Sequence, residues 1–175
     1  MKKVLAFGLL LMPLIAKSQV FSKEAFEYAN QKWSIGIMGG GIGIFDDKTR
    51  GGFGLNLTIK GIYLDFLGKG SSHKSDTKVD KWKESSGTVF HVGYQLPVTK
   101  SFRVIPVIGY YTLGSTTTDG YDWKVTSSGI SNKTSTSIDS RGVDYGGILV
   151  LNSRHVNFYG ACTTHALYGG VAYQF

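Results

Sequence analysis

Apolar and polar positions alternate with a period of two along most of this chain. In residues 87–97, Phe90 and Val92 fall on one face, and His91 and Gly93 fall on the other. A two-residue period places successive side chains on opposite faces of an extended strand, so the pattern predicts β-structure. We predict seven strands, each bounded by turn-forming residues: 33–45, 53–67, 87–97, 102–113, 139–151, 155–163 and 166–175.

The predicted strands are long, and most reach nine residues or more. A strand of a globular protein has about five to six residues, whereas a tilted transmembrane strand requires about 9–11. The face opposite the apolar one carries small or polar residues, as where Gly142, Asp144 and Gly146 oppose Val143 and Tyr145. Because a narrow barrel has little interior room, we predict an all-β fold, a closed antiparallel up-and-down transmembrane β-barrel with apolar side chains outward.

The strand count is odd, although bacterial single-chain barrels have an even number of strands. We therefore expect an eighth strand before residue 45. Either residues 20–31 form it, or the glycines at 39–41 break the segment 33–45 into a hairpin. Pro106 removes a ladder hydrogen bond from another predicted strand, and we expect a β-bulge there.

The first 18 residues have the features of a cleaved secretory signal peptide. Lys2 and Lys3 form a positive start, residues 4–15 are an uncharged run, and residues 16–18 offer small residues at a cleavage site. That run is too short to cross a bilayer core of about 30 Å as a helix. We divide the chain into the signal peptide 1–18, a lead-in 19–31 that forms either a short helix or a first strand, and a barrel domain 32–175.

Composition argues against several classes of function. The formal charge is +7, but three of the 19 basic residues lie in the signal peptide and the others are mixed with acidic residues, as in 78–84. Nucleic acid is not an expected partner, because no basic stripe is present to contact phosphates. Cys162 is the only cysteine, so it forms no internal disulfide, and it lacks the neighbouring ligands that zinc requires. We interpret it as a buried or lipid-facing thiol.

The sequence motifs predict no catalytic residues, no cofactor and no metal site. The segment GGGIG at 39–43 lacks the following helix and the spacing of a phosphate-binding loop. His73, His91, His155 and His165 occur without a recognised catalytic pattern, and we interpret Ser153 with His155 as solvated turn residues.

Several charged residues fall on the face expected to line the lumen. Buried charges persist only when they are paired and hydrogen-bonded, so we predict a structural polar network rather than an active site. Its expected members are Lys60, His91, Arg103 and Asp144.

Two long polar connections, 68–86 and 114–138, alternate with short turns. Membrane barrels carry tight turns at one end and longer loops at the other. We interpret the two long segments as surface loops that either lack a partner or recognise an unknown extracellular ligand. In the second case Trp82, Tyr121 and Trp123 would supply apolar contacts.

The chain ends in HALYGGVAYQF, and this ending resembles the last strand of bacterial outer-membrane β-barrels. Over about residues 31–175 the chain is similar to small, porin-like outer-membrane proteins of eight strands. The resemblance implies an assembly signal, read by the outer-membrane barrel insertion machinery, in which Phe175 and Tyr173 are the main determinants and Gly169 departs from a fully apolar series. It also implies a Gram-negative outer membrane and contact with outer-membrane lipid. The residues of this signal are Leu167, Gly169, Val171, Tyr173 and Phe175.

Eight strands enclose an interior that side chains fill, so an open water channel is not expected. The leading hypothesis is a non-enzymatic outer-membrane barrel that contributes to envelope structure or to surface interaction through its long loops. One alternative is a lipid A-modifying barrel enzyme that transfers or removes acyl chains. Another is a soluble exported lipocalin-like barrel that binds a small apolar ligand.

Overall fold

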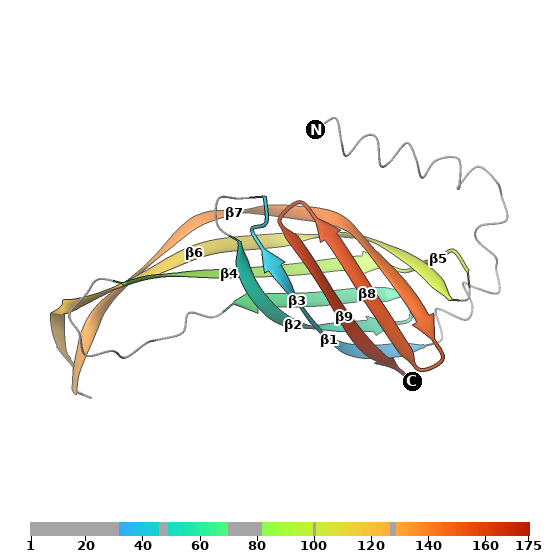
Figure 1. The fold of residues 1–175 in the computed structure, drawn as a ribbon, viewed down its shortest axis with the longest axis horizontal. Helices are drawn as coiled ribbons and strands as arrows, with labels where there is room; N and C mark the ends of the chain where they lie inside the picture. The colour runs from blue at the N-terminus through green and yellow to red at the C-terminus, as the bar shows by residue number, and fades with distance from the viewer. Residues whose placement is uncertain (1–31, 46–48, 70–81, 100, 127–128) are drawn as a thin grey trace.

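The computed structural model describes residues 32–45, 49–69, 82–99, 101–126 and 129–175, with only the backbone described for 82–83 and 118–134 (Figure 1). The predictions for the signal peptide, the lead-in 19–31 and much of the loop 68–86 lie outside these residues. Within the described ranges, no helix is long and apolar enough to cross a membrane. The chain is instead organised in strands.

Strand formation follows the two-residue alternation of the sequence. The strands are β1 (Trp33–Ile42), β2 (Arg50–Ile59), β3 (Ile62–Lys69), β4 (Trp82–Tyr94), β5 (Leu96–Pro97), β6 (Phe102–Thr126), β7 (Gly129–Ser153), β8 (Val156–Thr163) and β9 (Ala166–Gln174).

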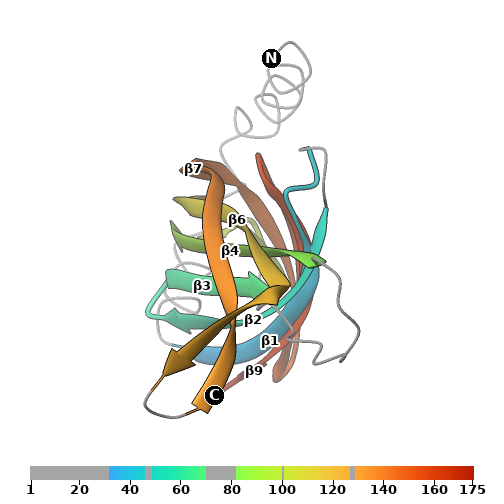
Figure 2. The same cartoon turned by 90° about the vertical axis from the view of Figure 1, so that its left-hand side faces the viewer.

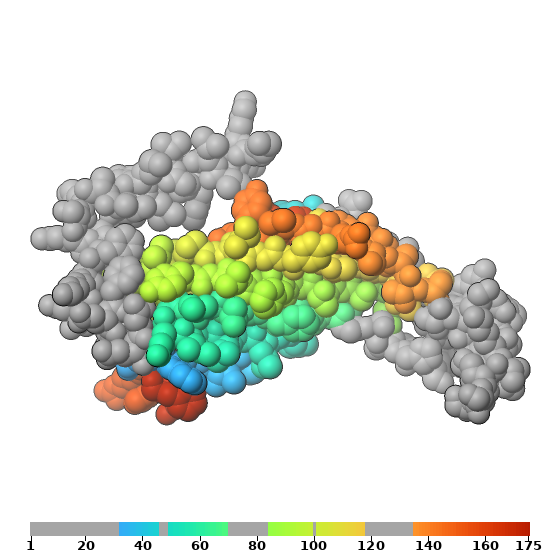
Figure 3. Space-filling view, turned by 180° about the vertical axis from the view of Figure 1, so that it is seen from behind, coloured from blue at the N-terminus to red at the C-terminus, as the bar shows by residue number. Residues whose placement is uncertain are grey.

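These strands close into one antiparallel barrel of eight strands within the described residues. The hydrogen-bonded order is β4-β3-β2-β1-β9-β8-β7-β6, and the pairing of β4 with β6 completes the ring. The short β5 continues the line of β4 and pairs with the same neighbour, β6. Figure 2 shows the strands wound around the barrel axis, and Figure 3 shows β3, β4, β6 and β7 side by side on the face that points away from the viewer in Figure 1. The predicted closed up-and-down barrel is confirmed.

The apolar side chains of the barrel face outward. On β1, Ile35 and Ile37 are 52% and 65% exposed, and on β2 Phe53 is 83% exposed. The alternate positions point into the lumen, where Met38 and Ile42 are buried. A soluble barrel would reverse this arrangement, since water does not favour a continuous apolar exterior. The geometry is that of a transmembrane barrel with hydrocarbon as its outer solvent.

The eighth strand does not lie before residue 45, so that prediction was wrong. The segment 53–67 is two strands, β2 and β3, joined by a tight turn at Lys60 and Gly61. Both turn residues have positive φ, 49° and 85° respectively. Such a turn matches the right-handed twist of the flanking strands, and Gly61 adopts it without a steric penalty.

The glycines at 39–41 do not break β1, which pairs continuously with β2 and with β9. Gly40 lies where β1 and β9 approach closely. A Cβ atom added there would lie 2.3 Å from the Leu167 carbonyl oxygen and 2.5 Å from the Tyr168 Cα. The absence of a side chain at Gly40 therefore permits the seam between the first and last strands to close.

Pro106 does not produce a β-bulge, contrary to expectation. The register between β4–β5 and β6 is the same on both sides of it, with Gly93 opposite Val107 and Leu96 opposite Val104. The ladder is only interrupted between these pairs, because proline has no N–H to donate. This interruption separates β5 from β4.

The segment 114–138 is mostly paired strand, so its interpretation as a loop was wrong. Strands β6 and β7 are 25 residues long, whereas β8 has 8. Beyond Gly146, which lies opposite Thr163, β7 has no β8 neighbour and continues with β6 as a hairpin past the barrel wall (Figure 1). The many Ser and Thr residues of this segment suit a loop, but Thr is β-branched and also suits a strand.

Candidate functional site

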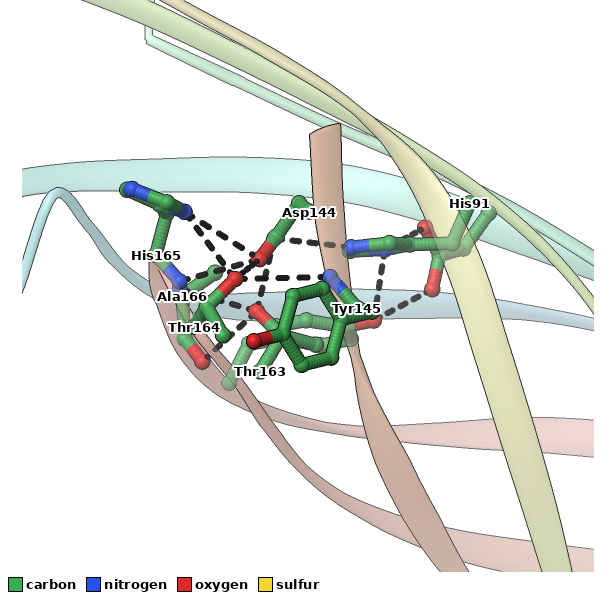
Figure 4. A network of polar contacts seen from close by, with 9 residues as sticks. His91, Asp144, Tyr145, Thr163, Thr164, His165 and Ala166 are labelled. Carbon is green, nitrogen blue, oxygen red and sulfur yellow. Dashed lines mark hydrogen bonds and ion pairs between the residues drawn. The ribbon is translucent and has the colours of Figure 1, made fainter. Parts of the chain in front are cut away.

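The lumen contains a buried polar cluster centred on His91 of β4. The His91 Nδ1 lies 2.8 Å from Asp65 Oδ1 on β3, and its Nε2 lies 2.9 Å from Asp144 Oδ2 on β7 (Figure 4). All three side chains are fully buried. In an imidazolium both ring nitrogens carry a proton, so His91 in this form donates one hydrogen bond to each carboxylate. His91 of β4 thus links its neighbour β3 to β7, which lies on the other side of β6.

The same cluster fastens the turn between β8 and β9. Asp144 accepts hydrogen bonds from Thr163 Oγ1 at 2.7 Å, Thr164 Oγ1 at 2.5 Å and the His165 backbone N–H at 3.0 Å (Figure 4). Tyr168 of β9 donates its hydroxyl proton to Asp65. These bonds satisfy both carboxylates, as buried charge requires.

A second polar layer fills the lumen closer to the end that carries the C-terminus. Arg103 of β6 donates to Gln95 Oε1 at 2.9 Å and to Gln174 Oε1 at 3.3 Å. Asn152 Nδ2 donates to Gln174 Oε1 at 2.6 Å and to Asn157 Oδ1 at 2.5 Å. This layer ties β6, β7, β8 and β9 to Gln95, which lies between β4 and β5, across the interior.

Apolar and aromatic side chains fill much of the rest of the lumen, together with a few buried polar ones such as Asn56 and Thr58. The largest fully buried apolar or aromatic side chains include Tyr63, Ile42, Leu67, Ile105 and Leu113. A barrel of eight strands has an interior of about this capacity. The lumen of the described barrel is therefore lined by packed side chains rather than by a ring of solvated ones.

The sequence prediction of a lumen network was correct for three of its four residues. His91 and Asp144 meet in one cluster, and Arg103 lies in the separate second layer. Lys60 does not enter the lumen, because it occupies the exposed turn between β2 and β3. Its position in an apparently continuous strand had hidden that turn.

Sequence reasoning missed Asp65 and Tyr168, which complete the cluster. Asp65 is a lone acidic residue within an otherwise apolar stretch, and it has the same inward phase as Tyr63 and Leu67. Tyr168 has the phase opposite to the apolar series of the last strand. Each signal was visible in the alternation pattern, but the partners that meet across the lumen were not.

The hairpin joins the barrel mouth through a polar cluster of its own. Arg50 Nη2 of β2 lies 3.5 Å from Asp139 Oδ2 of β7. Ser115 of β6 donates to Asp139 Oδ1 at 3.0 Å. The rings of Tyr111 and His165 stack with centroids 3.7 Å apart. These contacts fix the base of the hairpin on the barrel.

The residues of the expected assembly signal all lie on the outer face of β9 or directly after it. Phe175 is 70% exposed, and its ring meets that of Tyr173 edge-on at 5.1 Å. Between them in the chain, Gln174 points inward and is buried. Leu167, Gly169 and Val171 continue the exposed series. This placement is compatible with reading by a membrane machinery, and their role as a signal stays a prediction.

In the part of the chain that the structure describes, the remaining candidate residues do not come together in a catalytic or metal site. Cys162 is exposed on the outer face of β8, so it is a lipid-facing thiol. Ser153 and His155 are exposed at the turn between β7 and β8. Among the residues that the structure describes, no group of His, Cys, Asp or Glu could hold a metal ion.

An apolar groove of about 730 Å³ lies on the outer face, walled by Ile37, Phe53 and Phe66, where hydrocarbon surrounds the barrel.

No protein-family model matches this chain, and no curated protein matches it either. Among solved structures, it is similar to Ail, the attachment invasion locus protein of Yersinia pestis, at 13% sequence identity. The match covers 82% of this chain and 97% of that chain, with a TM-score of 0.49. A second structure of Ail, in complex with the heparin analogue sucrose octasulfate, matches with the same coverage and a TM-score of 0.46. The assignment of the fold rests on the strand pairing of this chain itself.

Proposed function

We propose that this protein is a non-enzymatic outer-membrane barrel whose function is to present the β6–β7 hairpin outside the cell. The hairpin carries the proposal, because its paired strands continue past the barrel wall on the end opposite the C-terminus. In the proposed orientation the C-terminus and the tight turns face the periplasm, and the hairpin projects outward. A paired and anchored hairpin offers a fixed surface, whereas an unstructured loop would lose conformational entropy on binding.

The lumen supports a structural role rather than transport or catalysis. Its two polar layers cross-link opposite strands and are buried, so they leave no solvated passage between them. A lipid A-modifying enzyme would need a reactive group that lipid can reach. The side chains of His91, Asp65 and Asp144 have zero exposure, and they are satisfied by hydrogen bonds within their own cluster. The outward apolar face likewise disfavours a soluble lipocalin-like barrel.

The proposal is tested by shortening the hairpin on living cells. Residues 119–133 are replaced by Asn-Gly, which joins the paired Thr118 and Thr134 in a tight hairpin turn and leaves every pair between β4 and β6 in place. Trypsin applied to intact cells is expected to cleave the wild-type hairpin and not the shortened one. Cells with the wild-type protein are expected to bind at least one surface of a glycan array or a panel of immobilised matrix proteins that cells with the shortened protein do not bind.

The two measurements test the orientation of the barrel and the binding role of the hairpin separately. If trypsin does not reach the hairpin, the proposed orientation is wrong. If the shortened protein supports the same binding as the wild type, surface interaction through the hairpin is wrong. Mass spectrometry of lipid A from a deletion strain tests the enzyme alternative, and we expect its acylation to be unchanged.

A further inference from the structure

Two tight turns at the end of the barrel that carries the C-terminus each contain a basic residue with positive φ. Lys60, between β2 and β3, and Arg154, between β7 and β8, have φ values of 49° and 54°. They are the only non-glycine residues with positive φ among those that the structure describes. Positive φ is favoured by Gly, Asn and Asp, because a longer side chain meets its own backbone there. At both positions the strained residue is basic and exposed.

Backbone strain that persists at an exposed position points to a function of the side chain. Asn at either position would form the same turn with less strain. The turn geometry alone therefore does not explain why both positions, Lys60 and Arg154, carry a basic residue. What the two residues share is a positive charge at the same end of the barrel.

The ends of β9 and β1 connect these two turns in one arc. The Gln174 N–H donates to the His155 carbonyl at 2.8 Å, next to Arg154 in the chain. The Phe175 N–H donates to the Trp33 carbonyl at 2.9 Å, and Trp33 lies opposite Ile59, next to Lys60. Basic turns thus flank the seam of the barrel on both sides.

Aromatic side chains fill the arc between the two cations. Trp33, Tyr173 and Phe175 are 52%, 52% and 70% exposed on the outer face. Tyr173 also stacks on the ring of His155, with centroids 6.0 Å apart. Exposed aromatic rings at the ends of membrane-spanning strands lie at the level of the lipid headgroups. The two cations therefore lie at the same depth as the headgroups.

The charged side chains of this rim are all basic in the described part of the chain. No Asp or Glu occurs in 57–64, 93–99, 101–103, 151–158 or 173–175. The nearest carboxylate in sequence, Asp65, is buried in the lumen and bonded to His91. An anion that approaches Lys60 or Arg154 from the membrane meets no acidic side chain on these segments.

We propose that this arc, formed by Arg154, His155, Tyr173, Phe175, Trp33 and Lys60, binds anionic glycerophospholipids. The cations contact the phosphate groups, and the aromatic rings contact the glycerol and upper acyl region. In the orientation proposed above, this is the periplasmic leaflet of the outer membrane. A basic side chain near an anionic membrane surface contributes about fivefold in lipid affinity.

The test uses Trp33 as the reporter within the arc. The chain has three tryptophans, and the variant W82F/W123F leaves Trp33 as the only one. The protein is folded into phosphatidylcholine vesicles that contain acyl-brominated phosphatidylglycerol, which quenches a neighbouring tryptophan. Quenching against brominated phosphatidylcholine gives the relative affinity of the two lipids at Trp33. Native mass spectrometry of the wild-type protein with phosphatidylglycerol, counting bound lipids, serves if the reporter variant does not fold.

We expect phosphatidylglycerol to be preferred at least fivefold, and K60N/R154N to bring the ratio close to one. The variant K60R/R154K keeps the charges and is expected to keep the preference. Arg141 is exposed on the outer face of β7 close to the hairpin end, so R141N is the matched control for a cation outside the arc and should also keep it. The proposal is overturned if K60N/R154N retains the preference, or if R141N lowers it equally. K60N/R154N should fold at least as well as the wild type in pure phosphatidylcholine, because Asn accepts positive φ.

Discussion

At the scale of single residues, the most consequential contact is the bridge that His91 makes between Asp65 and Asp144. Removing one partner of a buried ionic network leaves uncompensated charge, which costs about 3–5 kcal/mol. We expect His91→Leu to lower the free energy of unfolding by about this amount. Urea titration in phosphatidylcholine vesicles, with the folded fraction measured by electrophoresis of unboiled samples, checks this.

Two further variants test whether the loss of stability in His91→Leu comes from unpaired buried charge. His155→Leu removes a histidine from an exposed turn and should leave stability within about 0.5 kcal/mol of wild type. Asp65→Asn and Asp144→Asn added to His91→Leu should recover part of the loss, because the triple variant buries no unpaired charge. Equal stability of the single and triple variants would show that charge is not what His91 compensates.

Glycines on the two faces of the barrel provide a second residue-scale prediction. Gly40→Ala places a Cβ 2.5 Å from the Tyr168 Cα at the β1–β9 seam. Overpacking of this kind typically costs about 1–3 kcal/mol. Gly160 has no atom within 4 Å of an added Cβ on the outer face of β8, so Gly160→Ala is the matched control and should be nearly neutral. The same urea titration separates the two, and similar losses would contradict the close approach at the seam.

At the scale of the element, β9 combines closure of the barrel with an exposed aromatic end. Phe175 makes one backbone bond to Trp33 and one ring contact with Tyr173, and most of its side chain is outside the protein. We therefore expect deletion of Phe175 to reduce the yield in the outer membrane several-fold while changing the unfolding free energy of the purified, refolded barrel by less than about 1 kcal/mol.

Fractionation of cells and urea titration of refolded protein measure these two quantities independently. Gln174→Ala is the matched comparison, because Gln174 points into the lumen and bonds to Arg103 and Asn152. It should lose stability without losing the terminal aromatic. Normal outer-membrane yield after deletion of Phe175 would leave the assembly signal without support.

A strand could be predicted from the sequence where apolar residues on its outer face alternate regularly with small or polar residues on its inner face. The alternation of Phe90 and Val92 with His91 located β4, and the same logic placed the outer face of β9. The turn at Lys60 was missed although the phase of the alternation inverts there, from outward odd positions such as Leu55 to outward even positions such as Phe66. Lysine is not a usual turn residue, and the apolar residues on both sides of it made the segment resemble one continuous strand. The hairpin was missed because Ser and Thr suit loops and strands alike, and only pairing with the partner strand decides between them.

At the scale of the whole molecule, the sequence predicted closure but not the contacts across the lumen. The alternation pattern predicted for Asp144 and for Arg103 separately that the side chain points into the lumen. Which residues meet depends on the stagger of eight strands around the ring, and a local pattern does not contain it. The separation of His91 and Arg103 into two layers is therefore a result of barrel geometry.

These two layers lie in series along the lumen and lead to a prediction for permeability. The wild-type barrel should let L-arabinose into liposomes no faster than protein-free liposomes do, whereas a sixteen-stranded porin should swell them rapidly. His91→Ala with Tyr168→Ala opens only one layer, and Arg103→Ala with Gln174→Ala opens only the other. Because a solute must pass both, neither pair should raise the swelling rate alone.

The combined variant should raise the rate above the sum of the two pairs. Resistance of the unboiled barrel to detergent confirms in each case that the strands remain closed. Swelling by the wild-type protein, or full swelling after opening a single layer, would place the barrier elsewhere. If the combined variant does not conduct, the barrier to solutes is the apolar packing of Ile42 and Leu113, which are buried near the hairpin end of the lumen.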